Sequence, residues 1–206
     1  MFDAQARKII DPPLNRAGRY LASLGVGANA VTYIGFGIGI LAIPLLAGQY
    51  YTAALVVILL NRLADGIDGA VARACVANAQ GNGVTDFGGY LDIVLDFIFY
   101  AGVVFGFSLA DPANGAAASL LLFSFIGTAS TFLAFSALAA KRGLSTTERG
   151  QKSIYYLGGL AEGGETIVFL SLFTMWPAWF PVFAVVFSAM CWVTIVCRIM
   201  MARQLL

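Results

Sequence analysis

Long apolar segments separated by short polar turns are the dominant pattern along this chain of 206 residues. A helix needs about 20 apolar residues to cross the hydrocarbon core of a bilayer. Six segments reach this length, and each predicts a membrane-spanning helix because a backbone in lipid must satisfy its own hydrogen bonds. The predicted spans are residues 29–48, 51–77, 85–109, 116–140, 153–176 and 179–201. The pattern therefore predicts an all-α polytopic membrane protein, with residues 1–206 forming a single domain and residues 28–206 its six-helix bundle.

Residues 1–27, which precede the first span, show a different periodicity. Asp11 is followed by two prolines and is typical of a helix N-cap. The apolar residues after it share one helical face, and Arg16 and Arg19 lie away from that face. These apolar residues are Leu14, Ala17, Leu21 and Leu24. This pattern predicts an amphipathic helix in the membrane interface, and a soluble linker helix is the alternative.

Composition and charge narrow the class of protein further. Hydrophobic residues make up 60% of the chain and charged residues 11%, which excludes a soluble globular domain, a disordered chain and a nucleic-acid binder. With no histidine and three cysteines outside any metal-binding spacing, neither a histidine base nor a zinc site is expected. All twelve lysines and arginines fall on one side of the six predicted spans. The positive-inside rule then predicts that both chain termini are cytoplasmic.

Acidic residues inside the predicted spans carry the candidate chemistry. A charge at the centre of a bilayer costs at least about 2.5 kcal/mol and by default marks a functional site. Asp65 and Asp68 are three residues apart on one predicted helix, and Asp92 and Asp96 are four apart on the next, so each pair shares a face. Four such carboxylates need cations, and oxygen ligands favour Mg²⁺, Mn²⁺ or Ca²⁺. Two metal ions bridged by carboxylates are suited to phosphoryl transfer. Packing glycines beside arginine-paired carboxylates are the structural alternative.

A specific motif runs through these acids. Asp65-x-x-Asp68-Gly69-x-x-Ala72-Arg73 followed by Gly88-x-x-x-Asp92-x-x-x-Asp96 resembles the signature of the CDP-alcohol phosphatidyltransferases. The six spans, the N-terminal helix and the chain length also resemble this family. One departure is the fourteen residues between Arg73 and Gly88, where the family usually has eight. The pattern of the last three spans favours a bacterial branch distinct from the glycerol-phosphate enzymes.

The resemblance implies an integral membrane enzyme of phospholipid biosynthesis, which transfers a phosphatidyl group from CDP-diacylglycerol to an acceptor alcohol and releases CMP. Asp65, Asp68 and Asp92 would bind two Mg²⁺ or Mn²⁺ ions. Asp96 would complete the second metal site and act as the catalytic base. The residues that would contact the CDP moiety are Asn29, Thr32, Gly69, Ala72, Arg73 and Thr85. The family also implies a multi-pass protein of the bacterial inner membrane, a cytoplasmic active site and a homodimer.

The acceptor alcohol is the open question of the sequence. Lys152 precedes two glutamates in an otherwise apolar span, Glu162 and Glu165. These three residues are candidates for recognising the acceptor, and a structural ion pair is an equally supported interpretation. Two other classes of protein compete with the enzyme: a divalent-cation transporter, which would place its acids near the membrane midplane, and a non-catalytic membrane scaffold.

Overall fold

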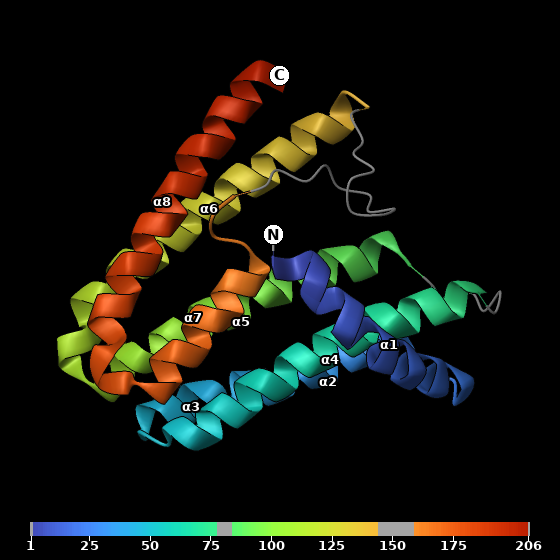
Figure 1. Ribbon diagram of the computed structural model, residues 1–206, viewed down its shortest axis with the longest axis horizontal. Coiled ribbons are helices and arrows are strands. Elements are labelled where there is room, and N and C mark those ends of the chain that lie inside the picture. The colour runs from blue at the N-terminus through green and yellow to red at the C-terminus, as the bar shows by residue number, and fades with distance from the viewer. Residues whose placement is uncertain (1, 78–83, 144–158, 206) are drawn as a thin grey trace. The chain divides into compact units, whose positions relative to one another are not determined.

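The protein is described by a computed structural model, which covers residues 2–77, 84–143 and 159–205. The elements in these ranges are all helical (Figure 1). They are α1 (Phe2–Ser23), α2 (Ala28–Ile40), α3 (Ala42–Ala47), α4 (Tyr51–Ala77), α5 (Asp86–Ala110), the 3-10 turn η1 (Pro112–Asn114), α6 (Gly115–Lys141), α7 (Gly163–Met175), the 3-10 turn η2 (Pro177–Trp179) and α8 (Phe180–Leu205). The chain folds as two compact units, Met1–Ala110 and Asp111–Leu206.

The lengths and composition of the helices agree with a polytopic membrane protein. In the described ranges, four segments are long and apolar enough to cross a membrane: Ala28–Ala47, Asp86–Ala110, Pro112–Lys141 and Pro177–Leu205. Helix α4 has 27 residues and the bounds predicted from sequence, but it carries several charged side chains. Helix α7 has only 13 residues. The count of six spans therefore stays a prediction.

The first predicted span is interrupted. Residues 29–48 were expected to form one helix, whereas α2 ends at Ile40 and α3 begins at Ala42. Pro44 explains the interruption, because its ring clashes with the carbonyl of Ile40 and its nitrogen cannot donate. The N–H of Leu41 turns instead to the carbonyl of Ile38, at 3.2 Å.

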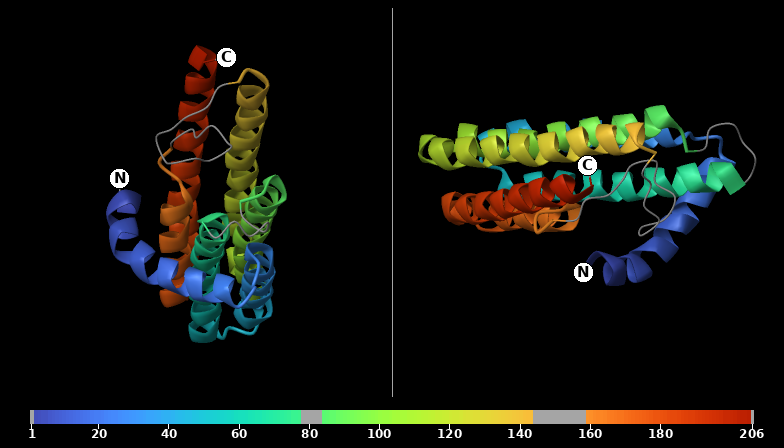
Figure 2. Two further views of the ribbon diagram at one scale, coloured as in Figure 1. Left: turned by 90° about the vertical axis from the view of Figure 1, so that its right-hand side faces the viewer. Right: turned by 90° about the horizontal axis from the view of Figure 1, so that it is seen from above.

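The N-terminal helix is confirmed, but its predicted start at Asp11 is wrong. Helix α1 begins at Phe2 and contains Pro12 and Pro13 in its interior. Proline has a helical φ, so the helix continues through this pair at the cost of two backbone hydrogen bonds, and such pairs bend a helix. Both views of Figure 2 show α1 as a bent helix.

The fifth predicted span is also shorter than expected. The prediction covered residues 153–176, of which residues 153–158 lie outside the described part of the chain. Residues 159–162 are not helical, and α7 begins only at Gly163. The hydroxyl of Thr194 on α8 accepts hydrogen bonds from the N–H groups of Leu160 (3.0 Å) and Ala161 (2.8 Å). These bonds hold residues 160 and 161 in a non-helical segment before α7, where the sequence pattern predicted continuous helix.

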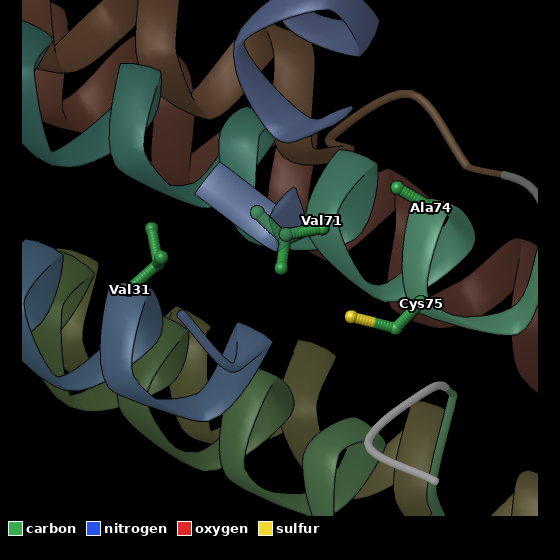
Figure 3. Close-up of a cluster of buried hydrophobic side chains, with 5 residues drawn as sticks. Val31, Val71, Ala74 and Cys75 are labelled. Carbon is green, nitrogen blue, oxygen red and sulfur yellow. The ribbon is translucent and has the colours of Figure 1, made fainter. Parts of the chain in front are cut away.

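A buried apolar cluster fixes the first unit around α4. Its buried members are Ala22 of α1, Val31 of α2, and Val71, Ala74 and Cys75 of α4. Figure 3 shows Val31 on α2, and Val71 and Cys75 on α4, facing the space between these two helices. The cluster sets the register of α2 against α4, and it lies next to the acidic residues of α4 in the sequence. In the second unit, α6 and α8 lie side by side.

Glycines allow α1 to approach α4 closely. A Cβ on Gly18 would lie 2.6 Å from both the carbonyl carbon and the Cβ of Ala70. A Cβ on Gly66 would lie 2.7 Å from a methyl carbon of Leu14. Contacts this short leave no room for any larger residue at Gly18, because backbone atoms cannot move aside as a side chain can.

Gly18→Ala is therefore expected to destabilise the protein by about 1–3 kcal/mol, the usual cost of overpacking. Gly37 is the matched control, because it also lies inside a helix and a Cβ there would meet nothing within 4 Å. Gly37→Ala should leave stability unchanged or raise it by up to about 1 kcal/mol, since alanine is the better helix former. Thermal unfolding in detergent measures both variants. Equal midpoints for the two would contradict the close packing of α1 on α4.

Candidate functional site

Three carboxylates from two helices meet in the first unit. Carboxylate oxygens of Asp65 and Asp68 on α4, and of Asp92 on α5, all lie within 4.8 Å of one another. Helix α2 contacts both α4 and α5, and in this way it holds the two acidic faces toward each other. Asp68 is buried, Asp65 is half-buried and Asp92 is exposed. The helical spacing of the acids therefore predicted their convergence correctly for three of the four.

A pocket in the same unit contains all four predicted acids. Its lining combines the acids with one arginine, two small polar side chains and a few apolar groups. The lining residues are Thr32, Gly35, Phe36, Asn61, Arg62, Asp65, Asp68, Asp92, Leu95 and Asp96. The hydroxyl of Thr32 donates a 2.6 Å hydrogen bond to Oδ2 of Asp68, which fixes the most deeply buried of the carboxylates. Thr32 follows Val31, so the apolar cluster of Figure 3 also positions this bond.

Asp96 lies in the pocket but has different partners from the other three acids. Its Oδ1 accepts a hydrogen bond from Nη2 of Arg62 at 2.7 Å, and its Oδ2 accepts one from the hydroxyl of Tyr100 at 3.1 Å. The guanidinium of Arg62 lies farther from Asp65, with Nη1 to Oδ2 at 3.8 Å. The four acids thus divide into a group of three with converging oxygens and a fourth that is bound to an arginine.

The set of three fits a divalent cation. Two oxygen ligands on opposite sides of Mg²⁺ are about 4.2 Å apart, and those on opposite sides of Ca²⁺ up to about 5 Å apart. The three oxygens lie within 4.8 Å of one another, close enough for one divalent ion placed between them to contact all three. Carboxylates that close together also need positive charge between them, because like charges repel strongly in a partly buried site.

Of the residues predicted to contact the nucleotide, Thr32 lines the pocket, and Asn29 and Thr85 lie together near the start of α5. Gly88 is close to both Asn29 and Thr85: a Cβ on it would lie 3.1 Å from Oδ1 of Asn29 and 3.1 Å from Oγ1 of Thr85. Thr85 precedes α5, and its hydroxyl accepts a 3.0 Å hydrogen bond from the N–H of Gly88 in the first turn. This is an N-cap, a local reason for α5 to begin at Asp86.

Gly69 and Arg73 share one edge of α4. Nη1 of Arg73 would lie 3.3 Å from a Cβ on Gly69, so the absence of a side chain there leaves room for the guanidinium. Nη2 of Arg73 donates a 3.1 Å hydrogen bond to Oδ1 of Asn15 on α1. Ala72 is half-buried beside them.

The predicted acceptor residues belong to the second unit. Oε1 of Glu162 accepts a 3.0 Å hydrogen bond from the N–H of Gly159, and Glu165 lies in the first turn of α7. Lys152 lies outside the described residues. Glu162 therefore lies at the N-cap of α7, before its first turn. The sequence pattern had placed it inside a continuous helix.

No catalytic or binding role follows from the sequence pattern for Arg62, Tyr100 or Asn61. Pairing of the carboxylates with arginine is only the structural alternative in the sequence pattern. Two signals were available: Arg62 precedes Asp65 by three residues, and Tyr100 follows Asp96 by four, so each shares a helical face with an acid.

Comparisons with known proteins identify the family of the chain. Residues 26–200 match the family model of CDP-alcohol phosphatidyltransferase. The chain is 51% identical over 200 residues to the inner membrane protein YnjF of Escherichia coli, covering 97% of this chain and 94% of that one. It is 29% identical over 201 residues to archaetidylinositol phosphate synthase of Pyrococcus horikoshii, covering 98% and 96% of the two chains.

Solved structures share the fold. Phosphatidylinositol phosphate synthase of Mycobacterium tuberculosis with CDP-DAG bound has a TM-score of 0.70 and 22% identity, and the match covers 92% of each chain. The same protein in complex with manganese and citrate also has a TM-score of 0.70 and 22% identity, covering 92% of this chain and 88% of that one.

Proposed function

Because the chain belongs to the CDP-alcohol phosphatidyltransferase family, we propose that it transfers a phosphatidyl group from CDP-diacylglycerol to an acceptor alcohol and releases CMP. The observation that carries the proposal is the convergence of Asp65, Asp68 and Asp92 at positions of the family signature. The related mycobacterial structure that holds CDP-DAG supports the same donor. One family model covers residues 26–200, which supports a single catalytic domain over residues 1–206.

Two Mg²⁺ or Mn²⁺ ions are the proposed cofactors. Asp65, Asp68 and Asp92 would hold them, and Asp96 would complete the second site. The hard oxygen ligands favour either ion, and the mycobacterial protein was crystallised with manganese. When bound, the ions supply positive charge that stabilises the pyrophosphate and the departing CMP.

The chain's own side chains would position the substrates and move one proton. The acceptor hydroxyl attacks the phosphorus that carries the diacylglycerol, and the bond from that phosphorus to the CMP oxygen breaks. A carboxylate oxygen of Asp96 accepts the hydroxyl proton. Arg73 and the space beside Gly69 suit the pyrophosphate, because a guanidinium pairs well with phosphate oxygens. The remaining proposed contacts to the CDP moiety are Asn29, Thr32, Ala72 and Thr85.

The membrane setting completes the proposal. The inner-membrane relative and the apolar helices support a multi-pass protein of a bacterial inner membrane. We place both termini and the active site on the cytoplasmic side, with α1 in the membrane interface, because the basic residues gather there. A homodimer is proposed from the family. Lys152, Glu162 and Glu165 are the proposed contacts to the acceptor.

CMP release tests the function directly. Purified protein in detergent or vesicles would receive CDP-diacylglycerol, Mn²⁺ or Mg²⁺, and one acceptor from a panel of inositol phosphate, glycerol phosphate, inositol, serine and choline. We expect CMP release with one acceptor and its loss when EDTA removes the ions. For aspartate-to-asparagine changes in the pocket, Asp111→Asn is the matched control and should keep the CMP release of the wild-type protein. Asp111 lies outside the pocket, and asparagine also caps a helix. No metal-dependent CMP with any acceptor would contradict the proposal, and ion flux through the vesicles would favour a transporter.

A further inference from the structure

Arg62 places a buried positive charge inside an otherwise acidic pocket. Its side chain is 9% exposed, and it precedes the first signature aspartate by three residues on α4. The family signature quoted above begins at Asp65 and does not include this position. Burying a guanidinium costs free energy unless hydrogen-bond partners satisfy its N–H groups.

The protein holds the guanidinium from three directions. Oδ1 of Asn61 accepts hydrogen bonds from Nε at 2.9 Å and from Nη2 at 2.6 Å. The hydroxyl of Tyr100 accepts one from Nη1 at 2.9 Å. The guanidinium carbon also lies 4.8 Å from the ring centroid of Phe99 and 5.1 Å from that of Tyr100, within the range of cation–π attraction. These contacts leave Arg62 little freedom to turn.

The guanidinium of Arg62 also binds one of the four carboxylates, that of Asp96. Arg62 Nη2 reaches Oδ1 of Asp96 at 2.7 Å, and the Tyr100 hydroxyl, which accepts from Arg62, donates to Oδ2 of Asp96 at 3.1 Å. Both oxygens of Asp96 are therefore oriented by a preformed frame. A charged hydrogen bond of this length is among the strong ones in proteins. Asp65, at 3.8 Å from Arg62, makes only a longer contact.

We propose that Arg62, fixed by Asn61 and Tyr100, is a positioning residue that orients Asp96 as the proton acceptor and separates it from the three converging carboxylates. The inference rests on the proposed function for the role of Asp96. Arg62 acts through Asp96 and needs no contact with either substrate.

Because Arg62 is charged, its effect on Mn²⁺ binding distinguishes this role from a purely packing role. A guanidinium beside Asp65 repels a divalent ion bound in the same pocket, because both are positive. Removing that charge should therefore leave the first Mn²⁺ ion bound as tightly as before or more tightly, while turnover falls. A side chain that served only the packing of the pocket would weaken metal binding and turnover together.

The test uses the full-length protein with three substitutions. Arg62→Met keeps the apolar stem and removes the charge, Arg62→Lys keeps a charge without the planar fork, and Tyr100→Phe removes only the hydroxyl. We expect Arg62→Met to lower kcat about 10- to 100-fold, the usual effect of losing a supporting hydrogen-bond partner at a metal site. KM for CDP-diacylglycerol should change little, Mn²⁺ affinity measured by calorimetry should not fall, and Arg62→Lys and Tyr100→Phe should give intermediate kcat values. Arg203→Met is the control for loss of a basic residue far along α8.

A second measurement is independent of activity. Asp96→Asn would be combined with wild-type Arg62 and with Arg62→Met, and Mn²⁺ affinity would be measured for all four proteins. Asp96 released from Arg62 should contribute more to Mn²⁺ binding, so Asp96→Asn should weaken binding more in the Arg62→Met background. An equal effect in both backgrounds overturns the inference even if the wild-type protein releases no CMP.

The kinetic outcomes decide the inference as well. Unchanged kcat in Arg62→Met overturns it, and so does a joint loss of Mn²⁺ affinity and kcat in a folded protein. If Arg62→Met fails to fold, wild-type kcat in both Arg62→Lys and Tyr100→Phe overturns it. If the wild-type protein is inactive with every acceptor, the proposed function fails, and the four-protein comparison still judges the pairing of Arg62 with Asp96.

Discussion

Asp92→Asn is expected to reduce CMP release by about 10³-fold or more. Asp92 is the one member of the converging set that α5 contributes, so its loss leaves that set with only the two carboxylates of α4. An amide is a poorer ligand than a carboxylate for a hard divalent ion, and the ions supply several kcal/mol of transition-state stabilisation. At about 1.4 kcal/mol for each factor of ten, that loss corresponds to this reduction in rate.

The measurement pairs the rate of CMP release with Mn²⁺ affinity. Both should fall, and part of the rate should return at high Mn²⁺ concentration, because the variant would be short of metal and not of a base. Asp92 is exposed, so the change to asparagine should leave the unfolding midpoint near that of the wild-type protein. Wild-type Mn²⁺ affinity in Asp92→Asn would exclude this residue as a metal ligand.

Asp96→Asn is expected to reduce the rate of CMP release by about 10² to 10⁴-fold, the usual contribution of a positioned general base. Its amide cannot accept the proton of the acceptor hydroxyl. Unlike Asp92→Asn, it should keep the binding of the first Mn²⁺ ion, since Asp96 lies outside the set of three converging oxygens. Added Mn²⁺ should not restore the rate, because a filled second metal site does not replace the missing base.

Asp96→Asn also leaves the guanidinium of Arg62 facing a neutral amide. A folded variant with normal affinity for the first Mn²⁺ ion and little turnover is the expected combination, and circular dichroism with thermal unfolding establishes that it is folded. A rate within about threefold of the wild-type value would remove Asp96 from the proposed proton transfer.

The sequence predicted most helices because their burial in lipid leaves a simple signal, a long apolar run between polar turns. The bounds of α4 were predicted without error, and the spacing of Asp65 and Asp68 on it placed both acids on one face. The identity of the family was also predicted from the signature residues, and the family model confirms it.

The remaining features depend on contacts between segments. The break at Leu41 follows from one proline, Pro44. Hydropathy alone cannot show that this proline interrupts the helix. The late start of α7 depends on the hydroxyl of Thr194, which lies more than thirty positions later in the chain. The pairing of Arg62 with Asp96 joins two helices and could be recognised only once their relative rotation was known. Local periodicity describes one helix at a time and therefore misses all three.

The close fit of α1 on α4 has a consequence for how such chains diverge and how they can be recombined. Leu14 fills the space that the missing side chain of Gly66 leaves, one residue after Asp65. The sizes of these two residues are therefore coupled: a larger residue at position 66 requires the Leu14 side chain to move or a smaller residue at position 14. A chimaera that exchanges the N-terminal helix between two members of the family should therefore keep its most native packing when positions 14 and 66 are exchanged together.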